Sequence, residues 1–317
     1  MKEYLISGKP EFKGILRDTE IPKPGPNDVL IKVIAAGLNP KDWKFTKARA
    51  ESEALNAGDD VAGIVEEVGS NVFEYKPGDR VAAFHRMGHP GGTYAEYSVA
   101  PASTTFHLPP NVSFEDGAGT PLSFITAALA LFQYLQVPLP TTPGQKNIGI
   151  LIYGGSSAVG SYALQLAKLS NLHPIITVAG SGIGHVKSLN AATHIIDYRE
   201  GSIKEQILDA ANGAKITLAF DAISGNDSYK AITEVLQAAG GGHINMHSGI
   251  TEEQAKADEE FSYVFYRYLS FILAKGAFKP HPVQVLPNGL NSIVDGVKAL
   301  YEGRVSAKKL IVRVAAE

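Results

Sequence analysis

The sequence contains no cysteine. Disulfide bonds, zinc sites built from thiolates and a cysteine nucleophile are therefore excluded. A long apolar run is also missing, because the stretch FITAALALFQYLQ is too short to span a membrane and contains two glutamines. No signal peptide is visible in MKEYLISGKP. We therefore expect a cytoplasmic protein that does not enter a membrane.

An excess of basic charge is missing as well. The formal net charge is -3, with 29 Lys+Arg against 32 Asp+Glu, which argues against a nucleic-acid partner. Of the 317 residues, 44% are hydrophobic and 19% are charged, so a sizeable core is available. This length suits two domains of ordinary size or one large α/β domain.

The pattern of apolar runs changes along the chain. Short extended runs such as DVLIKVIAAGL, AGIVEEVGS and TYAEYSVA fill the first third and are typical of a small barrel-like domain. From about residue 123, strands and helices alternate, which predicts a parallel sheet covered by helices on both faces. The C-terminal segment again contains short strands, with one helix between them. We expect it to join the N-terminal domain, because a lone strand–helix–strand cannot bury its own apolar faces.

The predicted fold class is therefore α/β, with a β-barrel domain and a doubly wound parallel-sheet domain. We place the barrel at residues 1–122 and 276–317, and the parallel sheet at residues 123–275. No internal repeat and no low-complexity segment interrupts this organisation.

The stretch ILIYGGSSAVGSYALQLAK has the setting of a dinucleotide-binding loop, since a buried strand runs into glycines and a helix follows. Glycines let backbone amides approach a pyrophosphate, and the helix N-terminus adds its positive dipole end. A serine stands where the usual fingerprint has its middle glycine. The alternative is a glycine-rich turn used only for helix–sheet packing. The candidate phosphate-binding residues are Gly155, Ser156, Ser157, Ala158, Val159 and Gly160.

An acidic residue at the end of the second parallel strand, which would bind the ribose hydroxyls of NAD, is absent. Ser181 and Lys187 follow that strand instead, and Tyr198 follows the third strand. Hydroxyl and basic groups attract a ribose phosphate. We therefore predict NADPH as the cofactor, bound in part by these residues, although a solvated helix face is the alternative for Lys187.

Several motifs together resemble one family. GLNPKDWK, AGDDVAGIVEEVG, KPGDRV, GGTYAEY, YGGSSAVG and the C-terminal tail occur in the order seen in medium-chain dehydrogenases/reductases. The sequence resembles the zinc-independent quinone oxidoreductase and enoyl reductase branch, and within it the fungal-type enoyl reductases that act in trans beside polyketide synthases. The resemblance implies a GroES-like barrel, a Rossmann domain, an active site between them, and a monomer or homodimer that could have a polyketide synthase partner.

The resemblance also implies that a metal site has been lost. In zinc-containing members, a cysteine in the segment matching GLNPKDWK and a histidine in the segment matching AGDDVAG bind the catalytic metal, and a glutamate follows the histidine. Here Asn39 and Pro40 stand in the first segment, Asp59 takes the histidine position and Asp60 the glutamate position. We predict no bound metal. We expect Asp60 to bond backbone amides or a basic residue, with Lys44 as the candidate for the charge that replaces the metal.

By the same resemblance, GLNPKDWK lines the active site. Lys44 would stabilise an enolate or deliver a proton, and Asn39 would donate a hydrogen bond to a carbonyl or to the nicotinamide; the alternatives are a surface ammonium and a turn residue. Thr126 would approach the nicotinamide ring, unless it only bonds within its helix. Further cofactor contacts are expected at the ends of the fourth and fifth parallel strands, at Ala222, Ile223, His247 and Ser248.

Other polar and aromatic residues fit less specific roles. His85 and His89 are expected on a loop, mostly exposed, with a substrate contact as the alternative. We expect Tyr94 and Tyr97 to face a core or a domain contact. The aromatic-rich start of EEFSYVFYRYLSFILAKG could wall an apolar substrate pocket.

The sequence leads to one main functional hypothesis. It is a zinc-independent NADPH-dependent reductase that transfers hydride to the C=C bond of an enoyl thioester, enone or quinone. A non-catalytic NADPH-binding or scaffold protein and an alcohol dehydrogenase with an atypical metal site are the alternatives.

Overall fold

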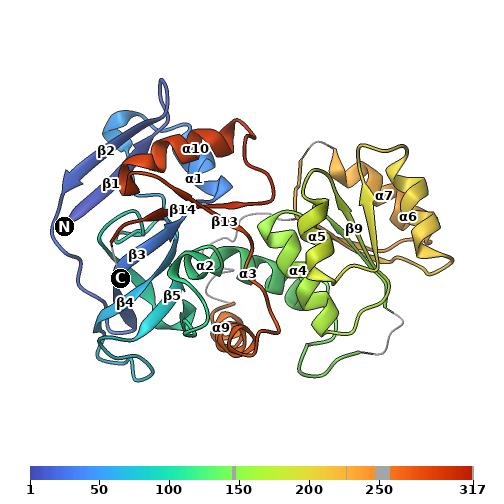
Figure 1. Cartoon of the computed structure of the whole chain (residues 1–317), viewed down its shortest axis with the longest axis horizontal. Helices are drawn as coiled ribbons and strands as arrows, with labels where there is room; N and C mark the ends of the chain where they lie inside the picture. Colours follow the sequence, from blue (N-terminus) through green and yellow to red (C-terminus); the bar gives the residue numbers. More distant parts are fainter. Residues whose placement is uncertain (145–147, 226, 247–257, 316–317) are drawn as a thin grey trace. The chain divides into compact units, whose positions relative to one another are not determined.

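The computed structural model describes residues 1–144, 148–225, 227–246 and 258–315. The chain forms two compact units, drawn in Figure 1. Unit 1 consists of Met1–Leu122 and Glu253–Glu317, and unit 2 consists of Ser123–Glu252. The predicted α/β fold class, with a barrel-like and a parallel-sheet domain, is confirmed.

Unit 1 is built on a largely antiparallel sheet with the order β13-β14-β3-β4-β5-β7, in which β6 also pairs with β3. Strand β3 is buried at most positions because it is paired on both edges and lies in the core of the barrel, which explains its nearly continuous apolar sequence. The strands of this sheet are β3 (Asp28–Gly37), β4 (Asp60–Val68), β5 (Arg80–Phe84), β6 (Tyr97–Pro101), β7 (Thr105–His107), β13 (Val283–Leu286) and β14 (Lys309–Arg313).

The C-terminal segment completes this unit. Strand β14 pairs antiparallel with β3, with Val312 opposite Ala36, so residues far apart in sequence share one sheet. Helices α1 and α10 lie against each other beside the β1–β2 hairpin (Figure 1). These elements are β1 (Lys2–Ser7), β2 (Lys13–Asp18), α1 (Pro40–Thr46), α2 (Phe114–Ala118) and α10 (Ile293–Tyr301), with short helical turns η1 (Glu51–Glu53), η2 (Ala102–Thr104) and η4 (Gly289–Ser292).

Helix α9 (Glu259–Ala274) also belongs to unit 1, whereas the sequence placed it in the parallel-sheet domain that was expected to end at residue 275. Its Arg267 guanidinium pairs with Glu74 and donates to carbonyl oxygens of η2, and Tyr266 stacks on Phe106 with ring centroids 5.6 Å apart. These contacts anchor the helix to the barrel. Apolar periodicity predicts the helix, but it does not say which neighbour buries its apolar face.

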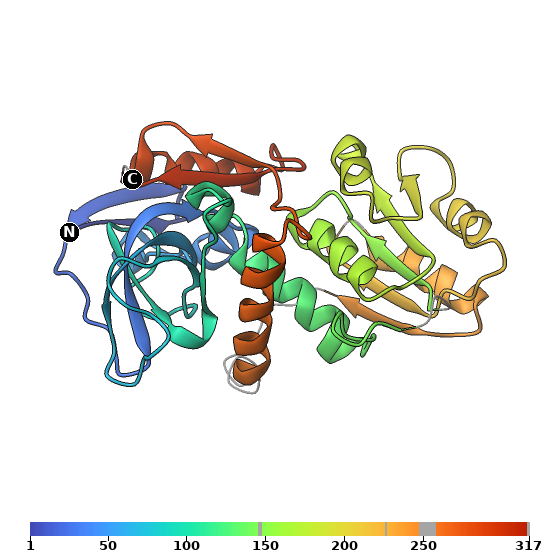
Figure 2. The same cartoon turned by 60° about the horizontal axis from the view of Figure 1, so that its bottom comes forward.

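Unit 2 holds a parallel sheet with the order β10-β9-β8-β11-β12. Helices α4 and α5 lie together on one face, and α6 and α7 lie together on the other, as Figure 2 helps to show. Strand β9 is buried at every position because both faces of the sheet are covered. The elements are α3 (Pro121–Ala128), which begins at the unit boundary, the π-helical turn η3 (Leu129–Tyr134), β8 (Ile150–Tyr153), α4 (Ala158–Leu169), β9 (Ile175–Ala179), α5 (Ile183–Leu189), β10 (His194–Asp197), α6 (Ile203–Ala211), β11 (Leu218–Asp221), α7 (Ser228–Ala238) and β12 (His243–Met246).

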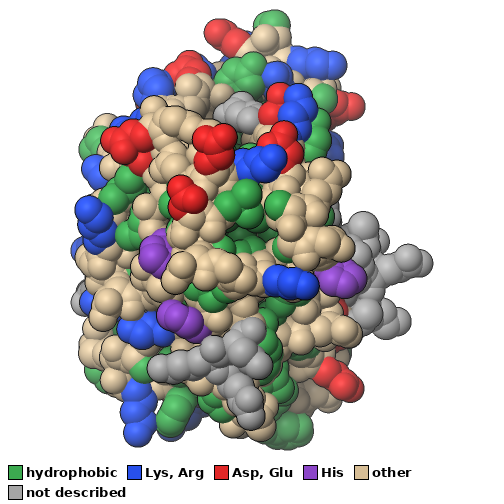
Figure 3. Space-filling model, turned by 90° about the vertical axis from the view of Figure 1, so that its right-hand side faces the viewer, with side chains coloured by type: hydrophobic (Ala, Val, Ile, Leu, Met, Phe, Trp, Pro, Cys, Tyr) green, Lys and Arg blue, Asp and Glu red, His purple; other side chains and the backbone are tan. Residues whose placement is uncertain are grey.

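The strand order of unit 2 reverses at β8, whose neighbours are β9 and β11. In doubly wound sheets, ligands bind at the carboxyl ends of the strands at this switch point. The face of unit 2 drawn in Figure 3 mixes acidic and basic side chains, unlike the single-sign surface of a typical nucleic-acid-binding domain. None of the described helices is both long and apolar enough to cross a membrane.

Candidate active site

The loop between β8 and α4 has glycine where the backbone requires it. Gly154 has a φ of 85°, in the left-handed region that favours glycine. A Cβ on Gly155 would lie 2.1 Å from Oγ1 of Thr177, and a Cβ on Gly160 would lie 2.2 Å from the carbonyl oxygen of Gly154. Both glycines therefore allow close approaches that a larger residue would prevent. These three positions correspond to the turn, the close approach and the helix–strand packing of a dinucleotide-binding loop.

Ser157 serves the helix that follows. Its hydroxyl accepts a hydrogen bond from the amide of Gly160 (3.0 Å) and donates to the carbonyl oxygen of Gly154 (2.8 Å), so it caps α4. The hydroxyl proton of Ser157 is therefore used inside the loop. Ser156, Ala158 and Val159 remain partly exposed around the start of α4.

The end of β11 reaches the same loop. Buried Asp221 accepts hydrogen bonds from the amides of Ile223 and Ser224, both at 3.0 Å, and thereby fixes the turn. Ala222 donates to the carbonyl oxygen of Tyr153 (3.0 Å), and a Cβ on Gly154 would meet the side chain of Ile223 at 2.4 Å. The structure thus brings two predicted cofactor residues, Ala222 and Ile223, to the glycine loop. The predicted residues His247 and Ser248 lie outside the described residues.

The residues predicted to bind a ribose phosphate follow strands β9 and β10. Tyr198 lies against the backbone just beyond β9, since a Cβ on Gly180 would meet its ring at 2.4 Å. Ser181, in the turn after β9, and Lys187, in the last turn of α5, are both exposed. The nearby acid Asp197 is paired with Arg199, whose hydrogen bonds lower the pKa of the carboxyl to about 2. Its negative charge is therefore already matched by a cation.

Helix α1 carries several of the predicted site residues at or near its N-terminus. Asn39 is its N-cap, Pro40 takes the first helical position, and the carboxylate of Asp42 accepts the amide of Asn39 at 2.7 Å. Asparagine, proline and an acid at these positions form a helix-start signal. The side chain of Asn39 is turned away from the helix toward Asp60 and Lys309.

Asp60 is fully buried and has three partners. It accepts hydrogen bonds from the amide of Leu122 (2.7 Å), from Nδ2 of Asn39 (3.0 Å) and from Nζ of Lys309 (2.9 Å). The sequence correctly predicted a backbone amide and a basic residue as its partners. The basic residue is Lys309 of β14, however, and not Lys44. Lys44 is exposed on α1, with its Nζ 5.8 Å from the centroid of the Trp43 ring.

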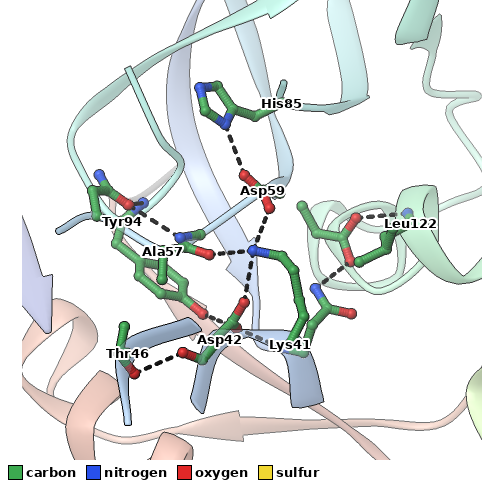
Figure 4. Close-up of polar contacts among 12 residues, drawn as sticks. Lys41, Asp42, Thr46, Ala57, Asp59, His85, Tyr94 and Leu122 are labelled. Atoms are coloured by element: carbon green, nitrogen blue, oxygen red, sulfur yellow. Dashed lines mark hydrogen bonds and ion pairs between the residues drawn. The ribbon is translucent and has the colours of Figure 1, made fainter. Parts of the chain in front are cut away.

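Asp59 lies in a second group of buried charges, shown in Figure 4. Its carboxylate contacts Nδ1 of His85 at 2.8 Å and forms an ion pair with Lys41. Nζ of Lys41 also lies 3.0 Å from the carboxylate of Asp42 and donates to the carbonyl oxygen of Ala57 at 2.5 Å. Asp59 is only 2% exposed, so its carboxylate does not face bulk solvent.

The expectations for His85, His89 and Tyr94 differ in outcome. His85, expected on an exposed loop, is buried with its second ring nitrogen 3.2 Å from the carbonyl oxygen of Pro90, whereas His89 is exposed as expected. Tyr94 is buried, as predicted, and its hydroxyl donates to Asp42 at 2.5 Å. Lys41 and Lys309 were not among the residues predicted for the site. The one sequence feature that could have indicated a buried Lys309 is its position at the start of the apolar strand β14.

Burial and ion pairing act against each other in this group. Burial alone lowers the pKa of Lys41, but the carboxylates of Asp42 and Asp59 outweigh it and hold this pKa above its ordinary value. Burial raises the pKa of Asp42, and the Lys41 ammonium and the Tyr94 hydroxyl offset only part of that effect. Burial and Asp42 raise the pKa of Tyr94, so its hydroxyl stays protonated and donates.

The donor set does not suit a catalytic zinc ion. Zinc sites use several nitrogen or sulfur ligands. Here Asp59 and Asp60 are already paired with ammonium groups, and Asn39 accepts from one of them. Within the described residues, no three His, Asp or Glu side chains are placed to hold a metal ion. The positive charges beside these two aspartates are those of Lys41 and Lys309.

Comparison with known proteins gives the family. Residues 25–110 match the family described as alcohol dehydrogenase GroES-like domain, and residues 158–270 match zinc-binding dehydrogenase. The trans-enoyl reductase fsr4 of Gibberella fujikuroi is 40% identical over 313 residues, covering 90% of this chain and 91% of that protein. The chain belongs to the medium-chain dehydrogenase/reductase superfamily, in its enoyl reductase branch.

Other members of this superfamily agree in length and fold. The trans-enoyl reductase RAP2 of Pyricularia oryzae is 30% identical, with 93% of each chain covered. A quinone oxidoreductase of Pseudomonas syringae pv. Tomato DC3000 has a TM-score of 0.75 at 23% identity, covering 98% of this chain and all (100%) of that chain. An alcohol dehydrogenase superfamily protein of Novosphingobium aromaticivorans reaches a TM-score of 0.83 at 21% identity, covering 99% and 100%. At these identities the solved structures show the shared fold.

Proposed function

We propose that this chain is a zinc-independent, NADPH-dependent reductase of the C=C bond of α,β-unsaturated carbonyl compounds. The observation that carries the proposal is the combination of a dinucleotide-type loop with two buried aspartates that are paired with Lys41 and Lys309. Alcohol oxidation in zinc enzymes needs the metal as a Lewis acid. Reduction of an activated C=C bond needs only a hydride donor and groups that stabilise the developing enolate.

NADPH fits the residues of unit 2. The glycine loop, the N-terminus of α4 and the turn after β11 would hold the pyrophosphate and riboses, and Ser181, Lys187 and Tyr198 would hold a ribose phosphate. Thr126, buried on α3, would approach the nicotinamide. Bound NADPH supplies the hydride.

The residues of unit 1 would act on the substrate. Negative charge develops on the carbonyl oxygen as the β-carbon of the substrate accepts the hydride, and hydrogen-bond donors lower the energy of that state. Asn39 retains an amide hydrogen beyond the one that it donates to Asp60. Exposed Lys44 would stabilise the enolate or deliver the proton that the α-carbon requires.

The names of the relatives suggest the form of the substrate. Several are trans-enoyl reductases, so we propose that the substrate is an enoyl thioester, carried on a polyketide synthase that acts as the partner. A free enone or quinone is the alternative substrate. We also propose that the chain acts as a monomer or a homodimer.

The test is NADPH oxidation by the purified chain with an enoyl thioester, an enone and a quinone. We expect turnover with the enoyl thioester, strongly reduced in Asn39→Ala, Lys44→Ala and Thr126→Val. Lys47→Ala is the matched control, because Lys47 is an exposed lysine at the end of the same helix and bonds Tyr301 instead. Tight NADPH binding without turnover of any substrate would overturn the proposal in favour of a non-catalytic NADPH-binding protein.

A further inference from the structure

Lys309, Asn39 and Asp60 form a closed ring of hydrogen bonds. Nζ of Lys309 donates to Oδ1 of Asn39 (2.5 Å) and to Oδ2 of Asp60 (2.9 Å), and Nδ2 of Asn39 donates to the same Oδ2 (3.0 Å). All three side chains are buried, with exposed fractions of 5%, 3% and 0%. The ring therefore forms away from the screening of bulk water.

This ring fixes which way the amide of Asn39 points. In the opposite orientation, its carbonyl oxygen would face the carboxylate of Asp60 and its NH₂ group would face the ammonium of Lys309. Groups of like charge would then face each other at both contacts, and such repulsion is costly in a buried site. Only the observed orientation satisfies both neighbours, and it leaves the second hydrogen of Nδ2 outside the ring.

Backbone hydrogen bonds hold Lys309 beside Asn39. The amide of Leu38 donates to the carbonyl oxygen of Leu310 at 2.9 Å, so the residues next to Asn39 and Lys309 are bonded to each other. The amide of Lys309 donates to the carbonyl oxygen of Pro282 at 2.8 Å. Strand pairing thus carries a residue 270 positions along the chain to Asn39 before any ligand binds.

We propose that Lys309 is a positioning residue for the reduction: it fixes the Asn39 amide so that its second Nδ2–H is presented to the carbonyl oxygen of the substrate. This inference rests on the proposed function and on the proposed role of Asn39 in it. Without Lys309, the amide could turn and offer its own oxygen to the developing enolate. Charge repulsion would then raise the barrier to hydride transfer.

The experiment is a double-mutant cycle measured on the full chain with NADPH and an enoyl thioester. It compares the wild type with Lys309→Met, Asn39→Ala and the double variant by kcat, KM, the Kd for NADPH and the urea midpoint. We expect Lys309→Met to lower kcat about tenfold or more, the effect of losing a hydrogen bond to a charged group, while the Kd for NADPH stays the same. In the Asn39→Ala background, Lys309→Met should lower kcat no further.

A further variant separates positioning from stability, because Lys309→Met leaves Asp60 buried without its cation. Asp60→Asn combined with Lys309→Met removes both charges, and should restore the urea midpoint but not kcat. Recovery of kcat together with the midpoint would show that Lys309 acts only through stability. Equal losses of kcat in the wild-type and Asn39→Ala backgrounds would also overturn the positioning role. A wild type inactive with every unsaturated carbonyl would overturn the proposed function, and this role with it.

Discussion

Replacing Lys41 by methionine should destabilise unit 1 strongly. The ammonium pairs with Asp42 (3.0 Å) and Asp59 and donates to the carbonyl oxygen of Ala57 (2.5 Å), and both carboxylates are buried. Removing one member of a buried charge group leaves its partners uncompensated and typically costs about 3–5 kcal/mol. Folded proteins have a total stability of only about 5–15 kcal/mol, so the urea midpoint should fall by about 1–2 M.

The single tryptophan, Trp43, provides the assay, because it lies on α1 and packs against Tyr301 at a centroid distance of 5.3 Å. Its fluorescence during urea titration reports the unfolding of unit 1. Lys44→Met is the matched control, since it removes an exposed ammonium from the same helix and should change stability by less than about 0.5 kcal/mol. The reasoning fails if Lys41→Met unfolds at the same urea concentration as the wild type.

A second substitution and a pH series test the cause. Asp59→Asn added to Lys41→Met removes one of the two carboxylate charges that the single variant leaves without a cation, so the double variant should be more stable than the single one.

Burial holds the pKa of Asp42 above its unfolded value, so this group stabilises the fold at low pH and loses that contribution as pH rises through its folded pKa. Without the Lys41 ammonium this pKa rises further. The single variant should therefore recover stability as pH falls from neutral, and a loss that is independent of pH would contradict this account.

Three further outcomes follow from the cofactor loop and from the pairing of Asp59 and Asp60 with lysines. Gly160→Ala should weaken NADPH binding in a fluorescence titration and lower stability by about 1–3 kcal/mol, because its Cβ would lie 2.2 Å from the carbonyl oxygen of Gly154; unchanged affinity would contradict that packing. Lys187→Glu should weaken NADPH binding about tenfold while the affinity for NADH changes little, and an equal loss for both would argue against a contact with the ribose phosphate. A chelator should leave NADPH oxidation unchanged, whereas stoichiometric zinc in the purified chain, found by metal analysis, would overturn the reading of Lys41 and Lys309.

Local patterns in the sequence sufficed for much of the fold. The alternation of strands and helices after residue 123 and the glycine loop before α4 follow rules that act over a few residues, and the structure has the parallel sheet that they predict. The position of α9 did not follow from its sequence, because Arg267 and Tyr266 find their partners in a barrel that is more than a hundred residues away along the chain.

The candidate site shows the same division between local and distant information. The sequence indicated that Asp60 needs a backbone amide and a cation, because a buried carboxylate without partners is costly. It pointed to Lys44, which is near in sequence, although strand pairing brings Lys309 to the carboxylate. Lys41 was overlooked because an exposed and a buried lysine on one short helix look alike until the partners of the helix are known.

The lysines beside the two aspartates have a consequence for engineering. Exchanging Asp59 for histidine would restore the residue that zinc enzymes have at this position, but the new imidazole would stand next to the Lys41 ammonium. A divalent cation there would meet the Lys41 ammonium at close range, with the Lys309 ammonium beside the neighbouring Asp60, and this repulsion would oppose its binding. Conversion to a metalloenzyme would therefore require the removal of both ammonium groups before any ligand could act. The ion pairs that stabilise the two aspartates would thus also oppose the binding of adventitious metal.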